Sequence, residues 1–223
     1  MKRLLLAGAV ALGLAAAIMI QTRGATDPVT ALPFGAANAQ ETAAVDTSSI
    51  VEMALGSDKA AVTMVEYASF TCPHCANFHK DQFQQLKADF IDTGKIRFIY
   101  RDVYFDRYGL WASMVARCGG QERFFGISDM IYNQQRDWIG DGQDPVQIAN
   151  NLRKIGKVAG LNGDQLEACL NDSDKAQALV AWYQANAEKD AVESTPTLVI
   201  DGQKYSNMAY DDLEAILNEK LGE

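Results

Sequence analysis

Hydrophobic and polar positions in the central part of the chain predict a strand, a helix and a second strand. Residues 61–67 alternate in polarity and are partly β-branched, which is typical of a strand. Apolar side chains in residues 76–90 recur at three- and four-residue steps, so we expect a helix with one buried face. Thr93–Gly94–Lys95 ends that helix, and residues 96–104 have the pattern of another strand.

From residue 106 to residue 190 the pattern is helical, with no convincing strand. The predicted helices cover residues 108–118, 121–134, 144–155, 162–170 and 173–189. Strand character returns at residues 197–200, and Asp201–Gly202 predicts a hairpin turn before a last helix over 211–221. The order is a βαβ unit, a helical block and a ββα unit, which indicates an α/β protein with a helical insertion.

The first residues have the composition of an export signal. Met1–Lys2–Arg3 is basic, and residues 4–20 carry no charge. Ala37–Asn38–Ala39 fits a small-x-small cleavage pattern, which places the mature start near Gln40. An uncleaved membrane anchor is the alternative. In either case we expect the rest of the chain, after a flexible lead-in over residues 40–50, to lie outside the cytoplasm, where disulfides persist.

The charge of the chain bears on its partners. The formal net charge is -9 and the pI is about 4.7. An acidic surface opposes electrostatic binding to nucleic acid or to an anionic membrane, so we predict no nucleic-acid partner. Charge gives no further functional information, and the chemistry has to be sought in particular side chains.

The sequence Cys72–Pro73–His74–Cys75 stands between the first predicted strand and the helix. A strand, a short turn, two cysteines spaced by two residues and a helix is the layout of a thioredoxin-like redox site. We expect Cys72 to be the nucleophile, because a helix N-terminus offers free N–H groups and a positive dipole to a thiolate. His74 would lower the thiol pKa further, and Cys75 would be the resolving cysteine. An inert disulfide or half of a zinc site is the alternative.

Two further positions are candidates for the same site. Thr195–Pro196 precedes a predicted strand, and a cis bond there would leave the Thr195 backbone free to pair with an extended substrate. A plain proline at a strand start is the alternative. Glu66 lies near the end of the first predicted strand, and if buried it could relay a proton to or from Cys75. A solvated strand end is the alternative for Glu66.

The other histidine and the other two cysteines have structural interpretations. His79 could bind a metal ion together with Cys72 and Cys75, but no fourth ligand is apparent. Its place on the apolar helix face favours a packed core histidine, so we predict no metal site. Cys118 and Cys169 remain once the first two cysteines are paired, and we expect them to form a structural disulfide. Two buried thiols are the alternative.

These features resemble the DsbA family of thiol:disulfide interchange proteins. The matching parts are the segment from Glu66 to Cys75, the helical block and Thr195–Pro196, and the resemblance covers residues 50–221. The resemblance implies a thioredoxin fold with an inserted all-helical domain. After the N-terminal residues 1–39, the implied division is a first thioredoxin-like part, the insertion and a second thioredoxin-like part, over residues 40–105, 106–190 and 191–223.

The resemblance also implies chemical roles and partners. It implies a cis bond before Pro196, a buried acidic role for Glu66, and no bound cofactor. Family members take oxidising equivalents from a quinone-linked, DsbB-like membrane partner and pass them to reduced, newly exported proteins. Thr195 stands where the best-known oxidases carry valine, and threonine there is more typical of isomerase and reductase relatives. The short segment after Gln40 leaves no room for an N-terminal dimerisation domain, so we expect a monomer.

The leading hypothesis is therefore an exported, periplasmic thiol:disulfide oxidoreductase that introduces disulfides into secreted proteins through Cys72 and Cys75. A reductase or isomerase of the same fold is the first alternative, and the reduction potential separates the two. A copper- or zinc-binding export protein that uses Cys72, Cys75 and His79 is the second alternative and belongs to another functional class.

Overall fold

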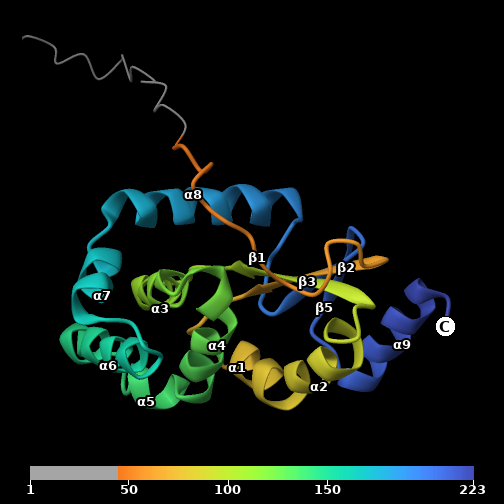
Figure 1. The fold of residues 1–223 in the computed structure, drawn as a ribbon, viewed down its shortest axis with the longest axis horizontal. Helices are drawn as coiled ribbons and strands as arrows, with labels where there is room; N and C mark the ends of the chain where they lie inside the picture. Colours follow the sequence, from red (N-terminus) through yellow and green to blue (C-terminus); the bar gives the residue numbers. More distant parts are fainter. Residues whose placement is uncertain (1–44) are drawn as a thin grey trace, which may run out of the picture. The chain divides into compact units, whose positions relative to one another are not determined.

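Five strands form one mixed sheet in residues 45–223, the part of the chain that the computed structural model describes (Figure 1). Strands β2 and β3 are parallel, and the other neighbours pair antiparallel in the order β1-β3-β2-β4-β5. The strand bounds are β1 Met53–Leu55, β2 Val62–Ala68, β3 Ile96–Asp102, β4 Thr197–Ile200 and β5 Gln203–Ser206.

Alternate side chains of β2 enter the cores on the two faces of the sheet, as the two-residue period of a strand requires. Met64 and Ala68 belong to the larger core, and Glu66 shares their parity and therefore their face. Val65 and Tyr67 belong to a smaller core on the opposite face. The strand reads as nearly continuous apolar residues because both faces are covered.

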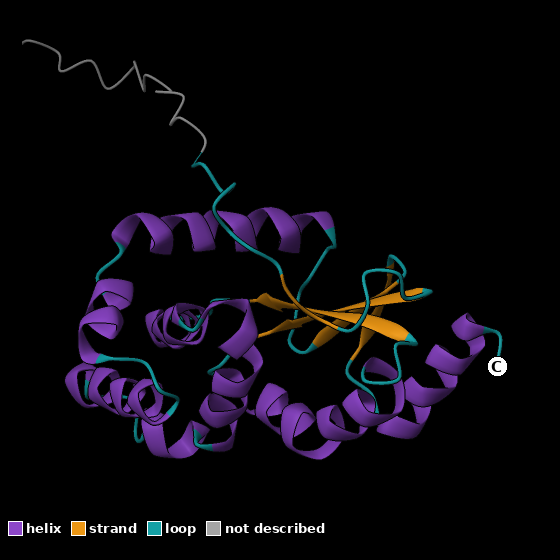
Figure 2. Cartoon of the chain, in the orientation of Figure 1, coloured by secondary structure: helices purple, strands orange, loops and turns teal. Residues whose placement is uncertain are grey.

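Helices cover both faces of this sheet (Figures 1 and 2). On one face, a single helical run begins with α1 (Pro73–Phe78) and includes α2 (Gln84–Leu86), with π-helical turns over His79–Phe83 and Lys87–Ile91. Helix α9 (Tyr210–Leu221) lies beside this run. Helix α8 (Ser173–Lys189) crosses the other face.

Between β3 and β4 the chain forms the helical block. Four of its helices begin at a capping residue whose side chain accepts hydrogen bonds from the first free N–H groups, whereas the two that follow Gly119 and Gln134 have no such cap. Asp106 accepts from the N–H groups of Tyr108 and Gly109, for example, at 2.7 and 2.9 Å. Before α8 the bounds are α3 Arg107–Cys118, α4 Gly120–Asn133, α5 Gln135–Ile139, α6 Pro145–Val158 and α7 Gly163–Leu170.

A polar cluster holds the end of α8 against the sheet. Arg101, on β3, donates from Nη1 to the Tyr67 hydroxyl at 2.7 Å and to Asp190 at 3.3 Å. The Tyr67 hydroxyl donates to the same Asp190 carboxylate. Glu52 accepts from the other guanidinium nitrogens of Arg101 at 3.0 and 3.2 Å. The planar guanidinium group of Arg101 suits this contact with both carboxylate oxygens of Glu52. The segment that follows α8 is thus held against the sheet at its first residue, Asp190.

Several elements differ from the sequence prediction. Strand β1 was not predicted, so the strand near residues 61–67 is the second one. Ile50, placed in a flexible lead-in, is 8% exposed and packs with Met114 and Leu179. The predicted helix 121–134 ends one residue earlier and is followed at once by the unpredicted α5.

The predicted signal or anchor over residues 1–39 lies outside the described residues. Within residues 45–223, no helix combines the length and the apolar character needed to cross a membrane. The order of elements is otherwise the predicted one, an α/β core interrupted by helices between its third and fourth strands.

Candidate active site

Cys72 is the residue at which the loop after β2 becomes helix α1. Its backbone is extended, with φ -82° and ψ 119°, and Pro73 occupies the first helical position. Proline suits that position, because its fixed φ matches the helix and the N–H it lacks would have no partner there. The Cys72 N–H donates to Ser69 at 3.0 Å, and the Cys72 carbonyl accepts from Ala76 at 3.1 Å. The sulfur is therefore attached at the positive end of a helix.

The two cysteines differ in exposure. Cys72 keeps 7% of its surface exposed, whereas Cys75 is fully buried. Pro73 and His74 are exposed beside them. Neither cysteine forms a disulfide in this structure. An attacking thiol can therefore approach the pair only from the Cys72 side.

The predicted proline loop lies next to this helix start. The bond between Thr195 and Pro196 is cis. Strand β4 begins with Thr197 opposite Tyr67, near the end of β2, and this register brings the loop before β4 to the loop after β2. The Thr195 carbonyl accepts from the Cys72 thiol at 3.4 Å. Cys72 and Thr195, which are 123 residues apart in the sequence, thus meet at the Cys72 sulfur.

The surroundings of Cys72 favour its anion. Its pKa is lowered to about 5, first because the Cys75 thiol donates a hydrogen bond to its sulfur. Burial opposes this effect, and the Thr195 side chain and the N–H groups of Cys75 and His74 add to it. The Thr195 hydroxyl is buried and has no other partner among the described residues. When Cys72 ionises it no longer donates to the Thr195 carbonyl, and the Thr195 hydroxyl can then donate to its thiolate. Cys72 is a thiolate at neutral pH.

Cys75 has the opposite character. Burial raises its pKa far above the ordinary range, and the hydrogen bond that it donates to Cys72 and the nearby charge of Glu66 raise the pKa further. Desolvation always penalises the charged form of a thiol. The pair therefore consists of one anionic, accessible sulfur and one protonated, buried sulfur, which is the division that thiol exchange uses.

Glu66 is buried in the core, and a histidine is its hydrogen-bond partner. The Glu66 side chain is 0% exposed, and its Oε2 lies 3.0 Å from Nε2 of His79, which is 3% exposed. The other carboxylate oxygen, Oε1, is buried without a hydrogen-bond partner among the described residues. The interpretation of Glu66 as a solvated strand end is therefore wrong.

Aromatic rings enclose the Glu66–His79 pair. The imidazole of His79 stacks on Tyr132 with ring centroids 4.2 Å apart, and it also packs against Phe83 at 4.7 Å. The Tyr132 hydroxyl bonds to the Tyr100 hydroxyl at 2.6 Å. His79 is thus a packed core histidine with a polar partner. Within residues 45–223 there is no group of three histidine, cysteine or acidic side chains that could hold a metal ion.

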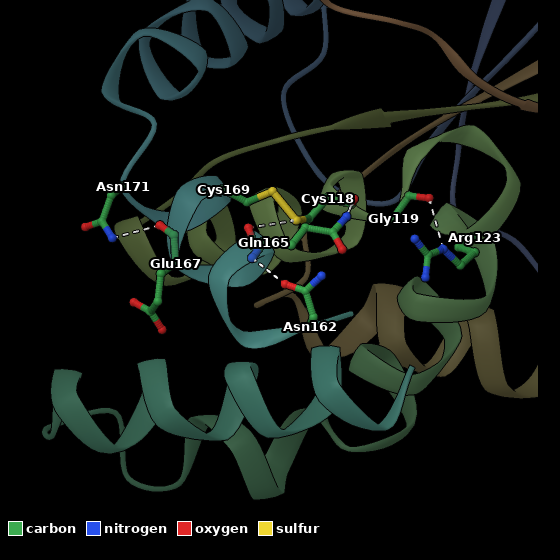
Figure 3. Close-up of a disulfide and its surroundings, with 8 residues drawn as sticks. All are labelled: Cys118, Gly119, Arg123, Asn162, Gln165, Glu167, Cys169 and Asn171. Carbon is green, nitrogen blue, oxygen red and sulfur yellow. Dashed lines mark hydrogen bonds between the residues drawn. A yellow bond between two sulfur atoms is a disulfide. The ribbon is translucent and has the colours of Figure 1, made fainter. Parts of the chain in front are cut away.

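Cys118 and Cys169 form the expected disulfide in the helical block, with their Cα atoms 5.9 Å apart (Figure 3). The bond joins the C-terminal end of α3 to α7. Gln165, also on α7, donates from its side-chain amide to the Cys118 carbonyl at 3.0 Å. The disulfide and this hydrogen bond together join α3 to α7 at two points.

Gln135 also lies at the site, although it was not among the predicted site residues. Its side-chain amide donates to the carbonyls of Phe70 and Cys72, at 2.8 and 3.0 Å. A glutamine inside a helical pattern carries no motif, and only the fold brings it to the nucleophile. The predicted active-site residues do lie together. Cys72 contacts Cys75 and Thr195, and Glu66 is near enough to Cys75 to raise its pKa.

Comparison with known proteins agrees with this arrangement. The thioredoxin family model matches residues 48–219. A Rickettsia felis protein named "Putative protein-disulfide oxidoreductase" is 31% identical over 173 residues, which are 77% of this chain and 61% of that protein. The chain thus spans about three fifths of the length of the Rickettsia relatives that it matches. Disulfide bond formation protein D of Bacillus subtilis is 25% identical, over 75% of this chain and 76% of that protein.

A solved structure extends the likeness to the fold. The crystal structure of Wolbachia pipientis alpha-DsbA1 superposes with a TM-score of 0.71 and 27% sequence identity, over 77% of this chain and 91% of that one. The shared architecture is a thioredoxin core with a helical insertion, as the sequence predicted. The chain therefore belongs to the thioredoxin family and, within it, to the DsbA-like proteins.

Proposed function

We propose that this protein is a thiol:disulfide oxidoreductase that oxidises pairs of thiols in exported proteins. The observation that carries the proposal is the contrast between the two sulfurs. Cys72 lies at a helix start with a pKa lowered to about 5, and Cys75 is buried with a raised pKa. Such a pair stabilises the dithiol form, and a stabilised dithiol makes the corresponding disulfide an oxidant.

In the first step a substrate thiolate attacks Sγ of Cys72 in the Cys72–Cys75 disulfide. A bond forms between the substrate sulfur and Cys72, and the bond between Cys72 and Cys75 breaks. The electron pair of that bond leaves on Cys75, which takes up a proton because its pKa is raised. The free backbone of the Thr195–Pro196 loop, which already contacts Cys72, would hold the substrate in an extended conformation.

In the second step another thiolate of the substrate attacks the substrate sulfur of this mixed disulfide. The leaving group is Cys72, and its lowered pKa makes it a good one. Two electrons have then passed from the substrate to the protein. The substrate carries a disulfide, and the protein is a dithiol with Cys72 ionised.

Glu66 is the proposed proton relay for Cys75. Its charge raises the pKa of Cys75, so the two groups are close enough to interact. Its Oε1 has no hydrogen-bond partner among the described residues and offers a free lone pair in a buried place. A base there is needed when a membrane partner reoxidises the dithiol, because the buried thiol must then lose its proton.

Residues outside the described part support the proposed location. The basic start and the apolar residues 4–20 favour export to the periplasm, as a cleaved or an anchored protein. Reduced, unfolded exported proteins would be the substrates, and a quinone-linked, DsbB-like membrane protein would restore the disulfide. We propose that the protein acts as a monomer.

Catalysed refolding tests this function. A reduced, unfolded substrate protein with two or more cysteines is mixed with the oxidised protein, and regain of substrate activity is followed. We expect rapid oxidation with the wild type and none with Cys72→Ser. Equal rates for the two proteins would reject the proposal.

A disulfide reductase or isomerase is the second candidate, and Thr195 favours it, because threonine before the proline is more typical of such relatives. The reduction potential, measured by equilibration with glutathione, decides the direction of transfer. A potential above that of glutathione supports the oxidase, and one well below it supports the reductase.

A further inference from the structure

We infer that Gln135 is a positioning residue through which the inserted helical domain holds Cys72 in the geometry that stabilises its thiolate. The inference rests on the proposed function and adds a residue to the same site. Gln135 belongs to α5, inside the insertion, whereas Cys72 belongs to the thioredoxin core. The side chain of Gln135 is therefore a direct link between the two parts at the reacting sulfur.

The contacts of Gln135 form a two-point clamp. Its Nε2 donates to the Phe70 carbonyl at 2.8 Å and to the Cys72 carbonyl at 3.0 Å, on both sides of Thr71. The residue is 7% exposed, so water does not compete well for these carbonyls. One amide group uses both of its donors on the backbone that precedes the active-site helix.

A second contact from the insertion holds Thr71, the residue between Phe70 and Cys72. The Thr71 hydroxyl donates to Oδ2 of Asp106 at 2.8 Å, and Asp106 is also the N-cap of α3. Residues 70–72 are thus held by three hydrogen bonds from two separate places in the helical block.

Helix α5 is itself firmly placed. Trp138 is 2% exposed and donates from its ring nitrogen to the Ile131 carbonyl of α4 at 2.9 Å. Asn151 of α6 donates to the Asp137 and Trp138 carbonyls at 3.4 Å each. A short helix tied to both of its neighbours can hold a side chain at a fixed position.

This clamp matters for the sulfur because the thiolate depends on the direction of nearby N–H groups. The N–H groups of His74 and Cys75 stabilise the anion while Cys72 keeps its extended backbone before the helix. Without Gln135, the Cys72 carbonyl retains only its bond from Ala76, and Thr71 alone ties residues 70–72 to the helical block. We therefore expect the loss of the amide to weaken the stabilisation of the thiolate.

The test replaces Gln135 by methionine, which has a similar length and no donor. The reduced variant is titrated by its ultraviolet thiolate absorbance, and we expect the pKa of Cys72 to rise by about one unit. At the pH where half of the wild-type thiol is ionised, only about one tenth would then be ionised in the variant. The equilibrium constant with glutathione should shift by about tenfold against the dithiol form.

Gln165→Met is the matched control. Gln165 also donates from its side-chain amide to a cysteine carbonyl, that of Cys118, but in the structural disulfide junction. This variant should keep the wild-type pKa of Cys72 even if it loses some thermal stability. A folded Gln135→Met protein with the wild-type pKa overturns the inference, and so does an equal pKa shift in both variants.

If Gln135→Met does not fold, NMR spectra of the isotope-labelled wild type test the inference instead. The side-chain amide resonances of Gln135 should move with the ionisation of Cys72 in the dithiol form. Resonances that stay unchanged through this titration overturn the inference. The proposed function fails separately. If the Gln135 resonances follow the ionisation of Cys72 but the wild type oxidises no substrate, the proposed function is rejected and the positioning role of Gln135 is supported.

Discussion

Acidification from neutral pH should lower the free energy of unfolding of the dithiol form more than that of the disulfide form. Cys72 titrates only in the dithiol form, with a pKa of about 5 in the folded protein and ~8.5 in the unfolded chain. A group whose pKa is depressed by folding stabilises the folded state fully above its unfolded pKa. This stabilisation is lost as the pH falls through the folded pKa. The effect therefore lies between ~8.5 and about 5.

The size of this change in unfolding free energy follows from the difference between the pH and the folded pKa of Cys72. Each pH unit in this window changes the free energy of unfolding by ~1.4 kcal/mol, and neutral pH lies about two units above the folded pKa. The contribution is then ~2.7 kcal/mol before screening. Water reaches the sulfur past the exposed Pro73 and His74, so we expect about 2 kcal/mol. Cys75 adds little from neutral pH downward, because its raised pKa keeps it protonated in the folded protein and the ordinary thiol pKa of ~8.5 keeps it protonated in the unfolded chain.

Urea unfolding of the two redox forms at a series of pH values measures this quantity. The difference in unfolding free energy between the dithiol and disulfide forms should shrink by about 2 kcal/mol between neutral pH and about pH 4. Reduced Cys72→Ser is the control, since it keeps the thiol of Cys75 and lacks the titrating sulfur. It should follow the pH dependence of the disulfide form.

Two results would refute this reasoning. One is a difference between the two forms that stays constant from neutral pH to about pH 4. The other is a reduced Cys72→Ser variant that retains the pH dependence of the reduced wild type. Either would mean that Cys72 is not an anion in the folded dithiol protein.

Three further predictions concern the buried groups. Glu66→Gln should slow oxidation of the dithiol by a small disulfide by about tenfold or more, because the base near Cys75 is lost; stopped-flow fluorescence that shows an unchanged rate contradicts the relay. His79→Leu should cost about 3 kcal/mol of stability in urea unfolding, because it leaves the Glu66 carboxylate buried and unpaired; Glu66→Gln in the same background should recover part of this loss. Cys118→Ala with Cys169→Ala, which opens a separation of 51 residues, should cost ~4 kcal/mol and leave the pKa of Cys72 unchanged.

Local chemistry made much of the site predictable from sequence. Cys72 and Pro73 announce a helix start by residue type alone, because a proline at the first helical position needs no partner for an N–H. Asp201–Gly202 predicts the turn between β4 and β5, and both residues have positive φ there. In these places the cause of the structure lies within a few consecutive residues.

The rest depends on contacts that the sequence does not order. Glu66 and His79 are 13 residues apart on a strand and a helix, and periodicity shows that each faces a core but not that they face each other. Strand β1 has three residues, too few for an alternating pattern, and it forms only because β3 offers an edge to pair with. Gln135 looks like any polar helix residue until the insertion packs against the loop before Cys72.

The cluster of Arg101, Tyr67 and Asp190 gives the site a second anchor, because Asp190 lies a few residues before the Thr195–Pro196 loop that meets Cys72. The first anchor is the hold of α5 and the start of α3 on the loop that carries Cys72. At the second anchor, Arg101 and Tyr67 bind Asp190 at the end of α8, where the segment that leads to Pro196 begins. The segment that leads to Pro196 is therefore held by the sheet at its start, whereas the loop that carries Cys72 is held by the helical block. A change at either anchor would thus be transmitted to the place where Thr195 meets the Cys72 sulfur.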